Sequence, residues 1–336
     1  MIIQLNNTIT EGQKENLFNK LVENKFSINE VNTQLEKYLV CIGKNEIDIR
    51  DFGNLPGIKD VHVVSDSYKL VSKKWKVKDT SIDLGNNVFI GKDNPSIMAG
   101  PCSVEGEEQI DKIVAHLLEQ NIKIIRGGVF KPRSSPYAFR GLGIDGLKMM
   151  YEKCKPHNIK IITEVMQVSQ IEEMLPFVDV FQVGARNSQN FNLLDALGEI
   201  DKPVLLKRGV SGTIEELLSS AEYVFSKGNE KLILCERGIR TFETAYRNTF
   251  DINAIQVLKE KTHLPVIADP SHGVGIRSFV PKLALSALLS GANGIIYEVH
   301  EKPEEALSDG QQTLNFMESS QLIEKIKLLY QSLIFN

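Results

Sequence analysis

Short runs of apolar residues recur along most of the chain, and longer segments with apolar residues at helical spacing separate them. The pattern predicts eight strands, at 96–100, 122–126, 159–163, 179–183, 203–207, 231–235, 265–269 and 294–298. Predicted helices lie between most of them, at 107–120, 142–157, 168–177, 190–199, 214–227 and 279–290. This alternation predicts a (β/α)8 TIM barrel over residues 96–336. The alternative is an open doubly wound sheet, which usually carries a glycine-rich dinucleotide fingerprint that is not found here.

The first 66 residues have a different pattern. An apolar start at 1–5 precedes a helix over 10–24 with Thr10 as its N-cap, two strands at 26–31 and 38–43, a short helix at 46–52 and a strand at 61–64. The order β-α-β-β-α-β predicts a ferredoxin-like α+β domain. A unit this small suits a small-molecule sensor, or else a structural or dimerisation element.

Residues 67–95 connect the two units. Residues 67–77 are polar and basic, which predicts a linker. In the segment Ile82–Ile90 the pair Asn86-Asn87 lies between apolar runs, which predicts a hairpin that caps the bottom of the barrel. The predicted domains are therefore 1–66, 67–95 and 96–336.

Composition limits the classes of partner. The chain of 336 residues has 39 Lys+Arg against 43 Asp+Glu, a net charge of −4, with 42% hydrophobic and 24% charged residues. This balance argues against general nucleic-acid binding, so local clusters of cations are expected to serve small anions. We find no signal peptide and no apolar run long enough to span a membrane. The four cysteines are far apart in sequence, which is typical of a reducing cytoplasm.

Polar residues follow the predicted strands. In a TIM barrel the active site lies at the carboxyl ends of the strands. Several cations fall there, and they would repel one another unless anions filled the space between them, so a substrate with several negative charges is expected. Taken alone, the basic loop after the second strand has a second interpretation as a solvated surface loop. The residues at the eight strand ends are Cys102, Arg126, Glu164, Arg186, Lys207, Glu236 with Arg237, Asp269 with His272, and Glu298.

A second group has the chemistry of a metal site. Cys102, His272, Glu298 and Asp309 offer a thiolate, an imidazole and two carboxylates, which suit Mn²⁺, Fe²⁺, Co²⁺ or Zn²⁺. Their spacing forms no local motif, so Cys102 also fits a small buried residue and His272 a turn residue. Strand alternation does not choose between Glu298 and His300 as the ligand.

With these motifs in order, the sequence resembles the 3-deoxy-D-arabino-heptulosonate 7-phosphate (DAHP) synthase family, type I-beta, over essentially its whole length. The matching stretches are Ala99–Glu105, Arg126–Pro136, Gly184–Asn187, Lys207–Gly209, Cys235–Gly238, Asp269–His272, Glu298–His300 and Leu307–Gln311.

The resemblance implies a metal-dependent condensation of phosphoenolpyruvate with erythrose 4-phosphate that releases phosphate, the first step of the shikimate pathway. By resemblance, the phosphoenolpyruvate-binding residues are Arg126, Lys131, Ala185, Arg186, Lys207 and Arg237. Arg133 and Ser134 would bind erythrose 4-phosphate, and Cys102, His272, Glu298 and Asp309 would hold the metal, which selects Glu298 over His300. Lys131, His272 and Cys102 are the catalytic residues that it implies, and Glu164 is our candidate for activating water.

Two alternatives remain at this point. The nearest is 3-deoxy-D-manno-octulosonate 8-phosphate synthase, which uses arabinose 5-phosphate, although that family typically has a longer sequence where this chain has Lys131–Ser135. The other is a regulatory binding protein on an inactive barrel. The resemblance further implies a cytoplasmic homotetramer that Tyr or Phe inhibits through the N-terminal domain, without nucleic-acid or membrane partners.

Overall fold

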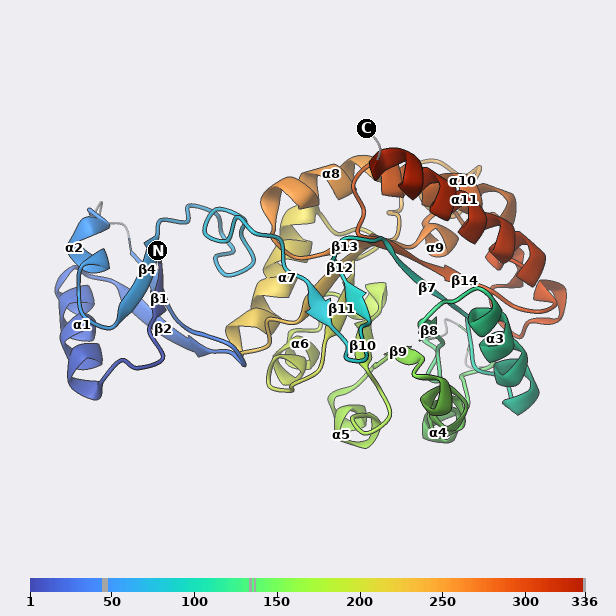
Figure 1. Cartoon of the computed structure of the whole chain (residues 1–336), viewed down its shortest axis with the longest axis horizontal. Coiled ribbons are helices and arrows are strands. Elements are labelled where there is room, and N and C mark those ends of the chain that lie inside the picture. Colours follow the sequence, from blue (N-terminus) through green and yellow to red (C-terminus); the bar gives the residue numbers. More distant parts are fainter. Residues whose placement is uncertain (44–47, 133–134, 136, 335–336) are drawn as a thin grey trace.

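The larger part of the chain forms a closed barrel of eight parallel strands in the computed structural model, which describes residues 1–43, 48–132, 135 and 137–334 (Figure 1). The predicted barrel is confirmed. Its strand order is β10-β11-β12-β13-β14-β7-β8-β9, and β9 pairs with β10 to complete the ring. The last barrel strand along the chain, β14, pairs with the first, β7. The strands are β7 (Ser96–Gly100), β8 (Ile124–Arg126), β9 (Lys160–Glu164), β10 (Val180–Val183), β11 (Val204–Lys207), β12 (Leu232–Glu236), β13 (Val266–Ala268) and β14 (Gly294–Glu298).

At least one helix follows every barrel strand and covers the outside of the sheet (Figure 1). The helices are α3 (Glu107–Glu119), α4 (Gly143–Cys154), α5 (Ile171–Met174), α6 (Phe191–Gly198), α7 (Ile214–Ser226), α8 (Ile252–Lys261), α9 (Pro270–Val274), α10 (Val280–Leu289) and α11 (Phe316–Ile334). Short 3-10 turns lie at Lys155–His157, Val168–Gln170, Ala185–Asn187, Arg277–Phe279, Pro303–Glu305 and Gly310–Gln312. In the described residues no helix combines the length and the apolar character needed to cross a membrane.

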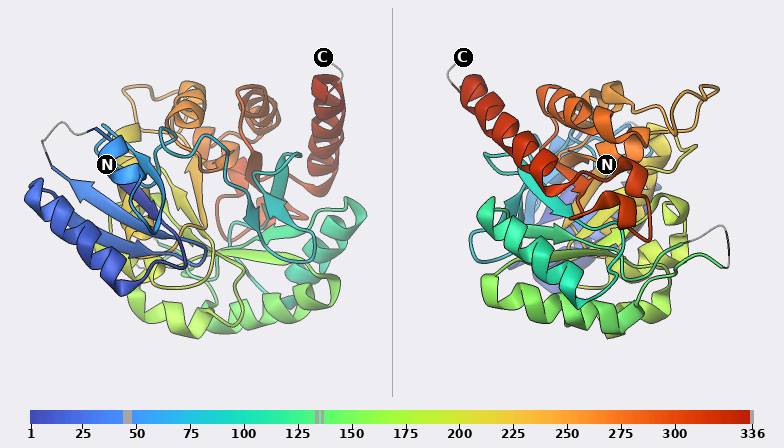
Figure 2. Two further views of the ribbon diagram at one scale, coloured as in Figure 1. Left: turned by 60° about the vertical axis from the view of Figure 1, so that its left-hand side comes forward. Right: turned by 90° about the vertical axis from the view of Figure 1, so that its right-hand side faces the viewer.

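The N-terminal unit has the predicted element order and lies beside the barrel (Figures 1 and 2). Its antiparallel sheet has the order β2-β3-β1-β4, and Thr10 caps its first helix through a capping box with Gln13. The elements are β1 (Ile2–Leu5), α1 (Glu11–Glu23), β2 (Ser27–Asn32), β3 (Lys37–Ile42), α2 (Arg50–Gly53) and β4 (Ile58–His62). The predicted helix at 46–52 lies partly outside the described residues.

The connection between the two units is largely buried. Tyr68, Leu70, Val71 and Trp75 belong to the same hydrophobic cluster as the outer face of the barrel strands. The carboxylate of Glu222 on α7 accepts hydrogen bonds from the backbone N–H groups of Leu70 (2.8 Å) and Val71 (3.0 Å). The predicted linker is therefore a strap that packs along the barrel, and we call residues 68–75 the strap below.

The predicted hairpin follows the strap. It is formed by β5 (Ile82–Asp83) and β6 (Phe89–Ile90), with Asn86 and Asn87 at positive φ in the turn. Ile82, Val88 and Ile90 pack against side chains inside the barrel, so the hairpin caps its bottom as predicted.

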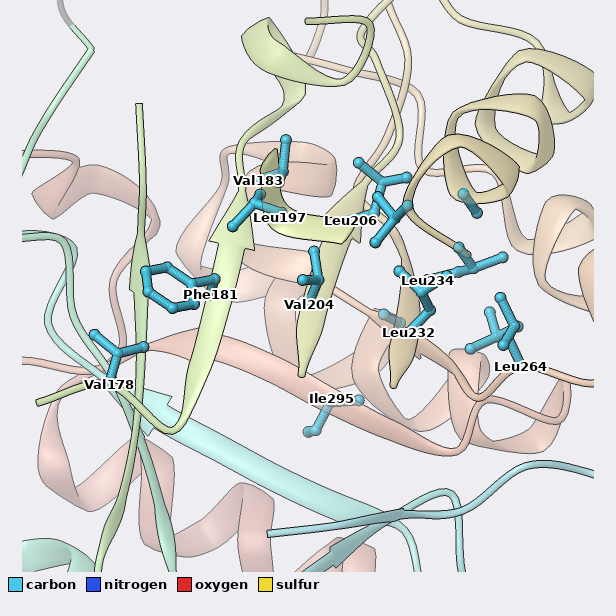
Figure 3. Close-up of a cluster of buried hydrophobic side chains, with 14 of the residues drawn as sticks. Val178, Phe181, Val183, Leu197, Val204, Leu206, Leu232, Leu234, Leu264 and Ile295 are labelled. Atoms are coloured by element: carbon cyan, nitrogen blue, oxygen red, sulfur yellow. The ribbon is translucent and has the colours of Figure 1, made fainter. Parts of the chain in front are cut away.

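Side chains alternate strictly between the two faces of each barrel strand. On β11 and β12, Leu205 and Ile233 fill the interior, whereas Leu206 and Leu234 pack outward against the helices (Figure 3). The N-terminal sheet joins the outer layer where Tyr38 makes an edge-on contact with Phe225 of α7, with ring centroids 6.2 Å apart. Thr33 adds a hydrogen bond of 2.6 Å to the Glu230 carboxylate. The N-terminal unit is thus packed on the side of the barrel.

Candidate active site

The candidate functional side chains continue the apolar rows that fill the barrel. Ile124, Ile162 and Leu205 lie in the interior cluster, and a residue two positions later on the same strand points into the same interior. The interior therefore changes from apolar to ionic at the carboxyl ends of the strands, where the active sites of such barrels lie. This two-residue step leads to Gly100, Arg126, Glu164, Gln182, Lys207, Arg237, Asp269 and Glu298.

A cavity of about 310 Å³ opens at this end of the barrel. Its lining brings the two carboxylates Glu164 and Asp309 together with many cations, which is an environment for a polyanionic ligand. The cationic side chains in its wall are Arg126, Lys131, Arg186, Lys207, Arg237, Arg240 and Arg247. Gly184 and Ala185 also line the cavity, where their small side chains leave the backbone close to it.

Arg126 is held in place and still has an unused donor. Its Nη1 donates to the backbone oxygen of Pro101 and to Glu298 Oε1, both at 3.0 Å. Its Nε is buried and has no hydrogen-bond partner within the part of the chain that the structure describes. A buried N–H without a partner is costly, and the Arg126 side chain also lines the cavity.

Three of the four predicted metal ligands form a tight cluster. The ligand atoms of Cys102, Glu298 and Asp309 all lie within 4.8 Å of one another. Cys102 Sγ is 3.3 Å from Asp309 Oδ2, and Lys131 Nζ is 3.1 Å from the same sulfur. Burial, followed by the Glu298 carboxylate, raises the pKa of the Cys102 thiol to about 12. A thiol and two carboxylates that are this close and mostly buried fit a divalent transition metal, which would offset their charge.

His272 lies on α9 with its imidazole turned to this cluster. The Asp269 carboxylate caps that helix through the His272 backbone N–H (3.0 Å) and contacts His272 Nδ1 at 2.7 Å. Burial alone would raise the pKa of Asp269, but His272 and Lys207 hold it well below its usual value. An anionic Asp269 favours the proton on Nδ1 and leaves Nε2 free to bind a metal. That nitrogen is 3.3 Å from Glu298 Oε1, so His272, whose backbone N–H is capped by Asp269, is a fourth candidate ligand.

The structure separates Glu298 from His300. Glu298 lies in the cluster, and its Oε2 accepts a hydrogen bond of 2.7 Å from Gln312 Nε2. His300 Nε2 instead faces Glu105 at 3.6 Å, and it is not among the described residues that line the cavity. Glu236 also turns away from the cavity, and the interior position after Cys235 belongs to Arg237.

Glu164 ends β9 at the cavity wall, where Gln182 Nε2 lies 3.4 Å from its Oε2. Within the described part of the chain it has no ion-pair partner. A side chain at Gly184 would place its Cβ 2.1 Å from Glu164 Oε1. Glycine at 184 is therefore what leaves room for this carboxylate.

Several cavity residues were not predicted. Arg240, Arg247 and Asn248 come from the segment between β12 and α8, where the sequence pattern indicated no element. Arg247 Nη1 reaches Gln312 Oε1 (3.0 Å) and Asp309 Oδ1 (3.5 Å). Gln312, the partner of Arg247, directly follows the family-like stretch Leu307–Gln311, and this was the only feature of the sequence that could have drawn attention to the contact. The predicted residues Arg133 and Ser134 lie outside the described residues, although Lys131 and Pro132 just before them line the cavity.

Comparisons with known proteins agree with this geometry. A model of the DAHP synthetase I family matches residues 76–333. A Thermotoga maritima protein named phospho-2-dehydro-3-deoxyheptonate aldolase is 46% identical over 293 residues, which are 87% of this chain and 86% of that protein. A Coxiella burnetii protein named 2-dehydro-3-deoxyphosphooctonate aldolase is 32% identical over 273 residues, 76% of this chain and 94% of that protein.

Solved structures give the same result. A crystal structure of the DAHP synthase from Thermotoga maritima has a TM-score of 0.79 at 42% identity, covering 99% of this chain and 97% of the other. A truncated form of the synthase from the same organism has a TM-score of 0.75 at 45% identity, covering 80% of this chain and 98% of the other. This chain therefore belongs to the DAHP synthetase I family.

Proposed function

We propose that this protein is a 3-deoxy-7-phosphoheptulonate (DAHP) synthase, a transferase that joins phosphoenolpyruvate to erythrose 4-phosphate at the entry to the shikimate pathway. The observation that carries the proposal is one cavity whose cationic wall also contains His272 and Asp309, the latter a member of the cluster with Cys102 and Glu298. The proposed reaction needs cations to bind phosphoenolpyruvate and a metal site to polarise the aldehyde of the second substrate, and this cavity offers both. The relative at 46% identity bears the corresponding name.

Phosphoenolpyruvate is the more highly charged substrate. Its phosphate and carboxylate would be bound by the guanidinium groups of Arg126, Arg186 and Arg237, by the ammonium groups of Lys131 and Lys207, and by the backbone at Ala185. All six of these residues line the cavity, which supports this assignment. Held between these groups, the substrate is positioned for reaction rather than merely bound.

Cys102, His272, Glu298 and Asp309 would hold a divalent metal ion. When bound, such an ion supplies Lewis-acid polarisation of the aldehyde oxygen of erythrose 4-phosphate. Lys131 Nζ lies 3.1 Å from Cys102 Sγ, and it would place a cation beside this oxygen, where negative charge develops.

The reaction forms one carbon–carbon bond and replaces the bond from C2 to the phosphate oxygen by a bond from C2 to the oxygen of water, whose two protons go to a base and to the released phosphate. The methylene carbon of phosphoenolpyruvate bonds to the aldehyde carbon, and the aldehyde oxygen takes up a proton. Water then adds at C2 of phosphoenolpyruvate and loses a proton, and cleavage of the bond from C2 to the phosphate oxygen releases inorganic phosphate. Glu164 would orient this water and accept its proton.

The second substrate distinguishes this proposal from the octulosonate alternative. Arg133 and Ser134 would bind the phosphate of a four-carbon sugar, because the sequence Lys131–Ser135 is shorter than its typical counterpart in enzymes that use arabinose 5-phosphate. The 46% identity to the heptonate enzyme against 32% to the octonate enzyme supports the same choice.

We expect the purified protein to turn over phosphoenolpyruvate with erythrose 4-phosphate at least about ten-fold more efficiently than with arabinose 5-phosphate. Loss of the ultraviolet absorbance of phosphoenolpyruvate measures both rates. A chelator should abolish turnover, and Mn²⁺, Fe²⁺, Co²⁺ or Zn²⁺ should restore it, which would also rank the metals. Preference for arabinose 5-phosphate would favour the octulosonate alternative, and no turnover with either sugar would favour an inactive barrel.

We further propose that the N-terminal unit is regulatory and that Tyr or Phe inhibits the enzyme through it, within a cytoplasmic homotetramer. None of the described residues of this unit lines the cavity. The strap joins it directly to α7. A truncated form of the Thermotoga relative, which covers 80% of this chain, supports a separable barrel.

Removal of residues 1–63 should leave an active enzyme that Tyr and Phe do not inhibit. The cut must precede the strap, because Val64, Tyr68 and Leu70 are buried in the barrel cluster. Steady-state rates with and without each amino acid measure the effect. A deletion of residues 1–76 is the control, and it should lower the melting temperature because the Glu222 carboxylate loses its partners. Inhibition that survives the shorter deletion would place the effector site elsewhere.

A further inference from the structure

We infer that the ion pair between Arg208 and Glu236, on the outer face of the barrel, is a positioning device for the two cavity cations Lys207 and Arg237. This inference rests on the proposed function, because it assigns a purpose to the same cavity. Neither Arg208 nor Glu236 is among the described residues that line the cavity. Each is nevertheless the sequence neighbour of a cation that does.

The alternation of the strands places the two pairs on opposite faces. Lys207 lies opposite Cys235 in the register of β11 and β12, and the Arg208 backbone N–H donates to the Cys235 oxygen at 3.0 Å. Lys207 and Arg237 continue the interior row of Leu205 and Cys235. Arg208 and Glu236 therefore continue the outer row of Leu206 and Leu234. Figure 3 shows Leu206 and Leu234 among the packed hydrophobic side chains.

Arg208 joins three segments through one side chain. Its Nη1 lies 2.9 Å from Glu236 Oε2 and 3.0 Å from Asp251 Oδ2. Its Nε donates to the Gly212 backbone oxygen at 3.0 Å. Asp251 is the N-cap of α8, with its carboxylate accepting from the Ala254 N–H. The end of β12, the turn after β11 and the start of α8 are thus tied to one guanidinium group.

Glu236 fixes the backbone around Arg237 with its second oxygen. Oε1 accepts a hydrogen bond of 2.7 Å from the Gly238 N–H. Gly238 has φ +82°, and an added Cβ would lie 2.6 Å from the Gly273 oxygen, so this turn requires glycine. The Arg237 side chain itself donates to the Gly238 oxygen at 3.2 Å. The position of its guanidinium group therefore follows the backbone that Glu236 holds.

Burying the ion pair of Arg208 and Glu236 has a large desolvation cost. Arg208 is 5% exposed and Glu236 is fully buried. Well-packed apolar residues commonly replace such a pair with no loss of stability. They would not, however, hold the Gly212 oxygen and the Gly238 N–H. The geometry thus points to a role in the placement of Lys207 and Arg237 rather than in stability.

The test compares the apolar pair Arg208→Met/Glu236→Leu with the isosteric Glu236→Gln in the full chain. The apolar pair should keep its melting temperature within a few degrees. Its KM for phosphoenolpyruvate should rise about ten-fold, with the KM for erythrose 4-phosphate nearly unchanged. Glu236→Gln keeps an acceptor oxygen for Gly238 and should show a smaller rise. As a control, Arg277→Met/Glu318→Leu removes an ion pair of 2.6 Å between residues that do not line the cavity, and no kinetic change is expected.

Calorimetric titration with phosphoenolpyruvate separates this inference from the proposed function. If the unmodified protein does not bind phosphoenolpyruvate, the proposed function fails. If it does bind, and the apolar pair or Glu236→Gln binds equally well, the inference is overturned. Equal increases in both KM values would also overturn it. If the apolar pair does not fold, Glu236→Gln decides: weaker binding of phosphoenolpyruvate supports the inference, and unchanged binding refutes it.

Discussion

Replacing Cys102 by serine is expected to strip the metal from the purified protein and to lower turnover about 1,000-fold, because Lewis-acid polarisation is worth several kcal/mol. Cys102 is 3% exposed, and its sulfur faces Asp309 and Lys131. The smaller and much less acidic serine hydroxyl is a poor ligand at the same place. Metal content per chain, measured by mass spectrometry of the purified protein, is the primary readout and does not depend on activity.

Cys154→Ser is the matched control for this experiment. Cys154 is an equally buried thiol on α4, and burial raises its pKa to about 12 as well. It lies in the outer hydrophobic cluster rather than in the cavity. The control variant should lose some stability and keep its metal. Full metal content in Cys102→Ser would remove Cys102 from the ligand set.

Glu164→Gln is the second change with a large expected effect. The amide has the shape of the carboxylate and fits the space beside Gly184, but it accepts no proton. We expect kcat to fall about 100-fold to 1,000-fold with little change in the KM for phosphoenolpyruvate. Steady-state kinetics at saturating metal measure both constants.

Glu164→Asp tests whether a base alone is sufficient. It keeps a carboxylate but withdraws it from the cavity by one methylene group, so its kcat should lie between those of the unmodified enzyme and Glu164→Gln. Unchanged turnover in Glu164→Gln would end the role that we propose for this residue. A rise in KM without a fall in kcat would instead assign it to substrate binding.

The barrel could be predicted from the sequence because each of its strands and helices is marked by a pattern of neighbouring residues. Each strand is a short apolar run, and the structure places the strands within two residues of the predicted ranges. The same alternation that fills the interior with Ile124 and Leu205 also carries Arg126 and Lys207 to the cavity. Regular strands thus predicted which cations converge.

The remaining parts depend on contacts between distant segments. Arg247 reaches Gln312 across 65 residues of sequence, and no local pattern indicates that contact. The strap was predicted as a linker because its lysines are prominent in the sequence. Its apolar residues Leu70 and Val71 instead find partners on α7, more than 150 residues later. Arg237 and Glu236 are adjacent polar residues, and the interior position of Cys235 shows that Arg237 is the one that points inward.

The candidate metal site also straddles the seam at which the barrel closes. Cys102 follows β7, the first strand, and Glu298 ends β14, the last, and these two strands pair with each other. Cys102 and Asp309 are 207 residues apart in the chain. An ion held between them would act as a staple across the seam, and its binding free energy would add to the free energy of ring closure. Formation of the metal site and closure of the barrel would then both depend on one event, the pairing of β14 with β7.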